Sequence, residues 1–122
     1  MVRFLLAFFY VAFLVNDCLG QVVVGADNER AYITRLQSKR IALVVNQTSR
    51  KGDQHLVDAF WEDGLDIGAI FAPEHGFRGD ADAGERVVDA SLNKIPVYSL
   101  YGSSKKPSAE QLEGIDLVVF DI

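Results

Sequence analysis

The stretch RIALVVN, residues 40–46, decides the fold class of this chain. Five consecutive apolar residues stand between Arg40 and Asn46, with no alternation of polar and apolar positions. A short unbroken apolar run is typical of a strand buried on both faces, as in a parallel sheet covered by helices. Similar runs follow at residues 65–72 (LDIGAIFA), 95–102 (IPVYSLYG) and 115–122 (IDLVVFDI). We therefore predict four strands of a mostly parallel sheet.

Helical patterns separate these strands. Residues 54–64 carry apolar side chains at helical spacing, and Asp53 is placed to cap their start. Residues 28–40 are predicted as a short helix, and residues 106–114 as a helix capped by Ser108. The alternation of strands and helices predicts an α/β fold with helices on both faces of the sheet.

The chain length and the last strand suggest the domain organisation. A chain of 122 residues is enough for one modest domain. The last apolar run ends at Ile122, whereas a core strand of such a sheet normally leads into a loop and a covering helix. We therefore expect residues 21–122 to be the N-terminal part of a longer α/β domain, with the sheet incomplete at its C-terminus.

The first residues have the pattern of a secretory signal peptide. Arg3 is followed by the apolar run FLLAFFYVAFLV at residues 4–15 and by the small residue Gly20. A membrane span needs about 20 apolar residues, so this run is short for one. We expect residues 1–20 to be a signal peptide and the remainder to be periplasmic or secreted, with no stable membrane insertion after cleavage. An uncleaved membrane anchor is the alternative.

Cys18 is the single cysteine of the chain. A lipid on Cys18 after cleavage is a third possibility, but residues 15–17 (VND) lack the small neutral side chains expected before a lipidated cysteine. Cleavage near Gly20 would remove Cys18 and leave no cysteine. Export without disulfides suits a bacterial periplasm or surface.

The acidic charge argues against nucleic acid as a partner. The formal net charge is −5. Residues 1–20 contain one Arg and one Asp, so their removal leaves this charge unchanged. Phosphate binding requires a basic patch, which the sequence does not predict.

A second stretch, FAPEHGFRGDADAGE at residues 71–85, follows a predicted strand with more ionisable groups than a turn requires. In open α/β sheets, ligands bind outside the carboxyl ends of the strands. Polar side chains follow each of the four predicted strands: Asn46, then Glu74 and His75, then Tyr101, then Asp121. We therefore predict a binding or catalytic site at this edge of the sheet.

Two carboxylates in this stretch fit glycoside hydrolysis. Glu74 and Glu85 belong to one loop, where one can donate a proton to the leaving oxygen while the other stabilises or attacks the sugar. Burial of one carboxylate beside His75 would separate their proton affinities. The alternative is that both only solvate the loop. Glu74 is the better candidate because it directly follows the strand.

The other candidate residues have structural alternatives too. His75 can serve as a general base, a metal ligand or a structural group, and Arg78 can bind a substrate carboxylate or pair with Asp80. Asn46 can bind a sugar or satisfy a turn, and Tyr101 can stack on a sugar or belong to the core.

Several motifs of other site classes are absent from the sequence. Only two histidines occur, without HxH or HExxH spacing, so no metal site is predicted. The sequence contains no GxGxxG, no Walker lysine and no GxSxG, so no cofactor and no serine elbow are predicted.

The segments RIALVVNQTS, IGAIFAPEHGFRGDADAGE, PVYSLYG and LEGIDLVVFDI, in this order, resemble the exo-β-N-acetylmuramidases of NamZ type. The resemblance implies a Rossmann-like N-terminal domain that carries the active site and a C-terminal domain that completes the cleft. It implies release of terminal N-acetylmuramic acid from peptidoglycan fragments, with a peptidoglycan-derived saccharide as partner.

The resemblance also implies roles for individual residues. Glu74 would be the catalytic carboxylate, with His75 and Glu85 beside it as further catalytic candidates. Asn46 and Arg78 would bind substrate, and Asp121 would open the family's FDIQD segment. From their places after the strands, we expect Tyr101 and Asp121 to bind substrate as well. Whether the reaction retains or inverts configuration, or uses the acetamido group of the substrate, stays open.

Two other functions compete with the muramidase hypothesis. A non-catalytic cell-wall sugar-binding module would use the same fold and the same edge of the sheet. An exported esterase or amidase is disfavoured, because the serine elbow and a cysteine nucleophile are missing.

Overall fold

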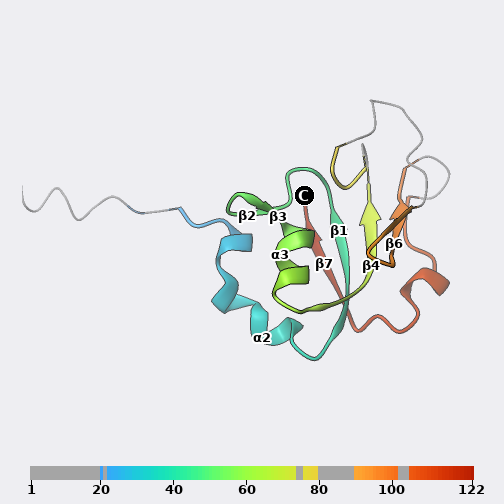
Figure 1. Ribbon diagram of the computed structural model, residues 1–122, viewed down its shortest axis with the longest axis horizontal. Helices are drawn as coiled ribbons and strands as arrows, with labels where there is room; N and C mark the ends of the chain where they lie inside the picture. Colours follow the sequence, from blue (N-terminus) through green and yellow to red (C-terminus); the bar gives the residue numbers. More distant parts are fainter. Residues whose placement is uncertain (1–19, 21, 74–75, 80–89, 102–104) are drawn as a thin grey trace, which may run out of the picture.

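The computed structural model describes residue 20 and residues 22–73, 76–79, 90–101 and 105–122 of the chain. Five strands form one sheet in the order β5-β6-β4-β1-β7 (Figure 1). Strands β6, β4, β1 and β7 run parallel to one another, which confirms the predicted mostly parallel sheet. Their bounds are Arg40–Val45 (β1), Asp66–Ala72 (β4), Ile95–Ser99 (β6) and Leu117–Asp121 (β7).

Strand β1 separates two apolar cores because successive side chains point to opposite faces of the sheet. Ile41, Leu43 and Val45 belong to the larger core, which includes side chains of α2 (Ile33–Leu36) and α3 (Leu56–Glu62). Ala42 and Val44 belong to the smaller core on the other face, with Leu112 of the 3₁₀ turn η4 (Glu110–Leu112) packed against it. Helical segments therefore cover both faces, as predicted, and α3 and η4 lie on opposite sides of the sheet (Figure 1).

Helix α3 begins later than the sequence suggested, and a different residue caps it. The predicted cap was Asp53, but His55 is the N-cap and its side chain accepts a hydrogen bond from the backbone N–H of Val57. Gln54 and His55 instead form strand β3 (Gln54–His55), which pairs with β2 (Arg50–Lys51) in a small antiparallel ribbon. The ribbon moves the start of the helix beyond the reach of Asp53.

The other two predicted helices are shorter than expected. Residues 28–40 contain η3 (Glu29–Ala31) and α2, separated at Tyr32, whose φ of −128° and ψ of −28° are not helical. Residues 106–114 contain only η4, because Glu113 returns to an extended conformation. In the described part of the chain, no helix is long and apolar enough to cross a membrane.

Strand β5 (Ala90–Leu92) was not predicted, and it pairs antiparallel with β6 through a tight hairpin. Asn93 and Lys94, the two turn residues, have φ values of 51° and 72°. Positive φ at both central positions is the signature of a turn that matches the twist of a hairpin. The usual sequence signal, a glycine at the second position, is replaced here by Lys94.

A bulge interrupts the pairing of the two central strands. Ile41 pairs with Ile67 and Ala42 with Ala69, so Gly68 is the extra residue in β4. A Cβ atom at Gly68 would lie 2.6 Å from Cδ1 of Ile115 and 2.8 Å from Nε of Arg40. Glycine therefore permits the close packing at this point of the sheet.

The last strand differs from the prediction that it is buried on both faces. In β7, Leu117 and Val119 pack against the larger core. Val118 and Phe120 point to the other face and are 46% and 71% exposed. The apolar composition of β7 therefore reflects burial on one face in this structure, which the unbroken run could not distinguish from burial on both.

Lys51 connects the segment before β1 to the end of α3 through two ion pairs. Its Nζ lies 3.0 Å from a carboxylate oxygen of Glu29 and 2.8 Å from one of Asp63. Hydrogen bonds to Asp63 and Glu29 raise the pKa of Lys51 well above its usual value. Tyr32 makes a second connection, because its ring contacts that of Phe60 on α3 with centroids 5.8 Å apart. Its hydroxyl donates a hydrogen bond within the segment, to the backbone oxygen of Ala26 at 2.6 Å.

Candidate functional site

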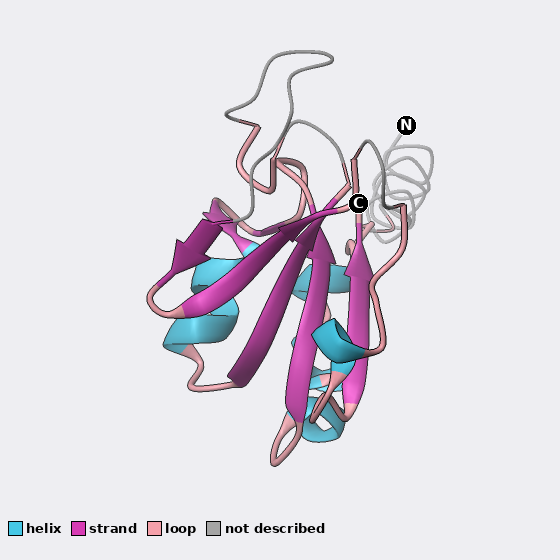
Figure 2. Cartoon of the chain, turned by 90° about the vertical axis from the view of Figure 1, so that its right-hand side faces the viewer, coloured by secondary structure: helices cyan, strands magenta, loops and turns pink. Residues whose placement is uncertain are grey.

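The four described site candidates follow the carboxyl ends of the parallel strands. Asn46 follows β1, Arg78 lies in the turn at residues 76–79 after β4, Tyr101 follows β6, and Asp121 closes β7. The carboxyl ends of these four strands lie at one edge of the sheet, where their arrowheads point in Figure 2. Glu74, His75 and Glu85 lie outside the described residues, so their roles stay predictions.

The side-chain oxygen of Asn46 accepts hydrogen bonds from the protein itself. Oδ1 accepts hydrogen bonds from the backbone N–H of Thr48 at 2.9 Å and from its hydroxyl at 2.7 Å. This is an Asx-type turn, the structural role weighed for Asn46 from the sequence. Its Nδ2 donates to no described residue, so Asn46 retains two N–H donors for a ligand.

Ser49 connects the ends of β1 and β7. Its side chain is fully buried, accepts a hydrogen bond from the backbone N–H of Asn46 at 3.0 Å and donates one to the backbone oxygen of Asp121 at 2.6 Å. Because both partners are backbone groups, Ser49 fixes the relative position of two candidate site residues. Sequence analysis did not predict this role, because a serine in a polar loop is usually exposed.

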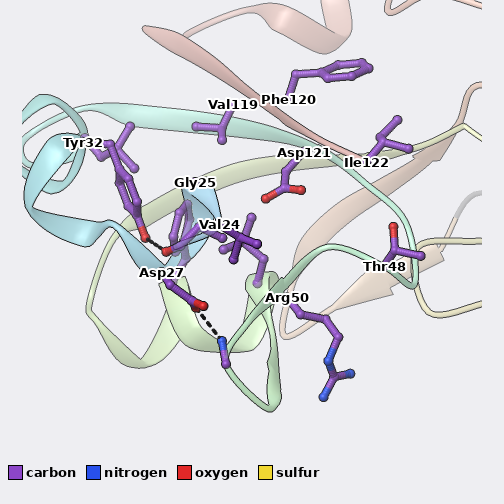
Figure 3. A pocket seen from close by; sticks show the side chains of 15 residues that line it. Val24, Gly25, Asp27, Tyr32, Thr48, Arg50, Val119, Phe120, Asp121 and Ile122 are labelled. Atoms are coloured by element: carbon purple, nitrogen blue, oxygen red, sulfur yellow. Dashed lines mark hydrogen bonds between the residues drawn. The ribbon is translucent and has the colours of Figure 1, made fainter. Parts of the chain in front are cut away.

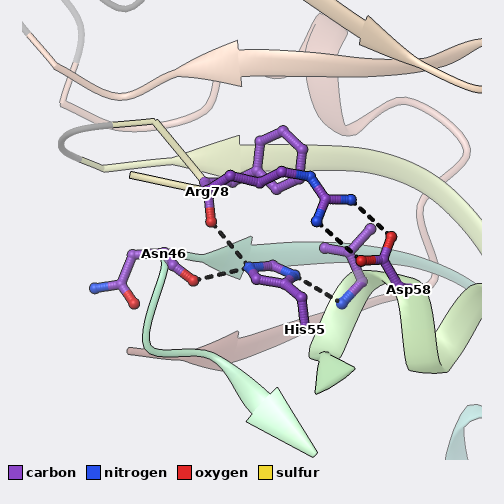
Figure 4. A network of polar contacts seen from close by, with 6 residues as sticks. Asn46, His55, Asp58 and Arg78 are labelled. Carbon is purple, nitrogen blue, oxygen red and sulfur yellow. Dashed lines mark hydrogen bonds and ion pairs between the residues drawn. The ribbon is translucent and has the colours of Figure 1, made fainter. Parts of the chain in front are cut away.

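His55 connects the end of β1 to the turn after β4. Its Nε2 lies 3.0 Å from the backbone oxygen of Asn46 and 2.9 Å from that of Phe77 (Figure 4). The two rings of His55 and Phe77 also meet edge to face, with centroids 5.7 Å apart. Sequence reasoning considered His55 only as a metal ligand and missed this contact.

Arg78 binds a carboxylate of the protein itself. Its two terminal nitrogens contact the two carboxylate oxygens of Asp58 on α3, at 2.9 and 2.7 Å, and its guanidinium lies 5.0 Å from the centre of the Phe77 ring (Figure 4). Hydrogen bonds from Arg78 lower the pKa of Asp58, although partial burial acts in the opposite direction. The sequence did not suggest Asp58 as a partner. Asp80, the partner suggested from the sequence, lies outside the described residues, so that pairing stays a prediction.

We expect the pair between Arg78 and Asp58 to stabilise the protein at neutral pH and to lose this effect in acid. The pKa of Asp58 is lowered by folding, so the contribution is complete above its ordinary value of 3.8 and disappears as the pH falls through the lower folded value. Both side chains are about one-third exposed, so Asp58→Asn should cost at most about 1 kcal/mol at pH 7.

Urea unfolding of wild type and Asp58→Asn at pH 7 and at pH 3 measures this difference. The gap in free energy of unfolding should narrow at pH 3 and in high salt. A gap that is constant with pH would show that the charge of Asp58 does not stabilise the folded state.

Gly79 lets the turn at residues 76–79 approach the loop after β1. Its φ is +78°, and a Cβ atom there would lie 3.1 Å from Cβ of Gln47. We expect Gly79→Ala to lower the free energy of unfolding by about 1–3 kcal/mol, because both the backbone conformation and the contact become unfavourable.

Two glycines provide matched controls for this change. Gly64 has a similar φ of +73° with no atom near its Cβ position, and Gly25 has open space without a positive φ. Gly79→Ala should therefore cost more than Gly64→Ala, and Gly25→Ala should be close to neutral. Equal losses at Gly79 and Gly64 would contradict a role for the contact with Gln47.

Asp121 also borders a cavity of about 730 Å³ on the α3 side of the sheet (Figure 3). The N-terminal segment, α3 and β7 line it, and most of the lining is apolar. Tyr101, in contrast, is 38% exposed beyond β6, and its backbone N–H donates a hydrogen bond to the Ser99 hydroxyl. Among the described residues, no contact joins Tyr101 to Asn46, Arg78 or Asp121.

The described residues do not form a metal site. Nowhere in them do three His, Cys, Asp or Glu side chains gather closely enough to hold an ion. The described groups at the strand ends are hydrogen-bonding groups and one ion pair.

Comparison with known proteins identifies the family. The family model of the N-terminal part of the exo-β-N-acetylmuramidase NamZ matches residues 41–122. The chain belongs to the NamZ family. This confirms the resemblance inferred from the segments around PEHG and VVNQTS.

Three similar proteins show how much of the chain is shared with known proteins. The peptidoglycan β-N-acetylmuramidase NamZ of Bacillus subtilis (strain 168) is 43% identical over an alignment 99 residues long, which covers 75% of this chain and 23% of the relative. Crystal structures of two DUF1343 family proteins from Bacteroides fragilis match with TM-scores of 0.65 and 0.64, at 34% and 35% identity.

These two structures cover 84% and 77% of the present chain, which covers 26% and 24% of theirs. The chain thus spans about a quarter of the length of these relatives. The shared part is an α/β unit, consistent with the Rossmann-like domain that the resemblance implied.

Proposed function

We propose that this chain forms the N-terminal, active-site part of an exo-acting β-N-acetylmuramidase that releases terminal N-acetylmuramic acid from peptidoglycan fragments. The observation that supports this most strongly is the family match over residues 41–122, which includes the PEHG motif after β4. The anchored turn at residues 76–79 supports it further, because it holds the segment after this motif close to Asn46.

Glu74 is the proposed general acid. Hydrolysis of a glycosidic bond requires a carboxylic acid that protonates the leaving oxygen, and a second group that stabilises the developing positive charge or activates the nucleophile. Glu85 and His75 are the proposed partners, since they belong to the same motif. The acetamido group of the substrate is a further candidate for the nucleophile.

Asn46 and Arg78 are the proposed substrate-binding residues among the described ones. The Nδ2 donors of Asn46 suit a sugar hydroxyl or an acetamido oxygen, because Oδ1 is already held by Thr48. Muramic acid carries a lactyl carboxylate, for which Arg78 is the proposed partner. Both terminal nitrogens of Arg78 donate hydrogen bonds to Asp58, so a substrate carboxylate would have to displace Asp58 to bind them.

Release of para-nitrophenol from para-nitrophenyl β-N-acetylmuramide by the full-length protein tests the proposal. The matching β-N-acetylglucosaminide, which lacks the lactyl ether, serves as the control substrate. We expect turnover of the muramide and much slower turnover of the glucosaminide.

A folded protein that hydrolyses neither substrate would overturn the muramidase proposal. Calorimetric titration with N-acetylmuramic acid would then identify the sugar-binding module, if binding is retained. The same fold and the same strand ends would serve that function without catalysis.

We also propose that the protein is exported to the periplasm or beyond, with residues 1–20 as its signal peptide. The basic start and the short apolar run support this. N-terminal sequencing of the protein recovered from periplasm and medium should give a chain that starts near residue 21. Recovery of the chain with Met1 intact from the cytosol would contradict export.

A further inference from the structure

His55 is a buried side chain whose two ring nitrogens are both engaged within the protein. It is 8% exposed, and Ser49 is the only other buried polar residue among those whose burial the structure describes. Nδ1 accepts a hydrogen bond from the backbone N–H of Val57 at 3.2 Å, which assigns the proton of the neutral ring to Nε2. The single Nε2–H is therefore shared between the backbone oxygens of Asn46 and Phe77.

These two oxygens belong to the segments that carry the proposed site. Asn46 ends β1 and presents the amide proposed to bind the sugar. Phe77 lies in the turn at residues 76–79, which only Glu74 and His75 join to Pro73 at the end of β4. A displacement of Phe77 is therefore passed on to the residues proposed for catalysis.

We propose that His55 is a positioning residue for the glycosidase reaction, an inference that rests on the function proposed above. Its Nε2–H keeps the turn after the PEHG motif at a fixed distance from Asn46, so that both segments act on the same sugar. His55 itself has no ring nitrogen left for substrate, and its effect is exerted through the two backbone oxygens. A misplacement of about 1 Å at a reacting group can cost about 100-fold in rate.

Two other contacts of this turn hold it less firmly than the His55 hydrogen bonds do. The ion pair of Arg78 with Asp58 is about one-third exposed, where salt and water weaken it. The contact of Gly79 with Gln47 is steric, and it limits approach without preventing separation. The hydrogen bonds of His55 are buried, so losing them leaves the two backbone oxygens without their donor.

Two substitutions separate the functions of the two ring nitrogens. In His55→Asn, the short side chain keeps an oxygen that can cap Val57, as Nδ1 does, but it cannot reach Phe77. In His55→Gln, the longer side chain places an amide N–H near the position of Nε2, but it caps the helix poorly. The first variant therefore retains the helix cap, and the second retains the donor to the turn.

We expect opposite effects on activity and stability in the full-length protein. His55→Asn should lower kcat on the chromogenic muramide by about 10- to 100-fold, although it retains the helix cap and its thermal midpoint falls no further than that of His55→Gln. His55→Gln should keep most of the wild-type kcat, although its thermal midpoint falls. A residue with a purely structural role would give activities that follow stability, with His55→Gln the less active of the two.

Hydrogen exchange provides a measurement that does not depend on turnover. The backbone amides of residues 76–79 should exchange faster in His55→Asn, while the amide of Val57 stays protected. His55→Gln should show the reverse pattern.

The outcomes distinguish failure of this inference from failure of the proposed function. If the wild type hydrolyses the muramide and His55→Asn has the same kcat, the positioning role is wrong and the proposed muramidase function is retained. An inactive wild type would overturn the proposed function and the catalytic part of this role together. Unchanged exchange at residues 76–79 in His55→Asn would overturn the contact itself, whether or not the wild type is active.

Discussion

Glu74→Gln is expected to lower kcat on para-nitrophenyl β-N-acetylmuramide by about 10²- to 10⁴-fold, the usual contribution of a general acid. The glutamine side chain is nearly the same size as glutamate but cannot transfer a proton to the leaving oxygen. Binding of N-acetylmuramic acid should change little, because the substitution alters proton transfer more than shape. Steady-state kinetics and calorimetric titration of the full-length protein measure the two effects separately.

Glu110→Gln provides a control for this change, because Glu110 lies exposed on η4, away from the strand ends. Its kcat should equal that of the wild type. A wild-type kcat in Glu74→Gln would exclude Glu74 as the acid. A large loss in Glu85→Gln would then transfer the assignment to Glu85, the second carboxylate of the motif.

Phe71→Ala is expected to lower the free energy of unfolding by about 3–5 kcal/mol, as is typical of a large aromatic side chain removed from a core. Phe71 lies in β4, at the centre of the sheet, and is fully buried. Its ring stacks on Tyr98 with centroids 5.5 Å apart, and Val44 packs in the same core. The alanine variant would lose these contacts and leave a cavity that the rigid strands cannot close.

Denaturant unfolding of the full-length protein measures this loss. Trp61→Ala is the matched control, because it also removes an aromatic ring but from a side chain that is 47% exposed. Its cost should stay within about 0.5 kcal/mol. Similar costs for the two variants would contradict the assignment of Phe71 to the core.

The unbroken apolar runs were sufficient to predict the parallel strands and their alternation with helices. They could not predict the strand order or the hairpin of β5, because a two-residue turn without glycine carries a weak signal. The apolar pattern also did not predict that two of the expected helices are short segments. Nothing in the local sequence marks Tyr32 and Glu113 as the residues where the helical conformation is lost. Gly68 gave no sign of a bulge until β4 was paired with β1.

In the candidate site, too, the positions of the residues were predicted from the sequence and their partners were not. Because parallel strands end at one edge, the sequence predicted that Asn46, Arg78, Tyr101 and Asp121 lie along that edge, and the described residues do so. The partners of these residues could not be predicted. His55 and Phe77 are 22 positions apart, Arg78 and Asp58 are 20 apart, and Ser49 and Asp121 are 72 apart.

The sequence by itself therefore determined the α/β class, the edge of the sheet where polar groups gather, and the NamZ-family motif. These properties follow from local composition and from the geometry common to all parallel sheets. Only the tertiary structure decided which groups hold one another at that edge. Hydrogen bonds and ion pairs between distant residues depend on strand order and on a few tenths of an ångström in packing, and neither is present in the local pattern of the chain.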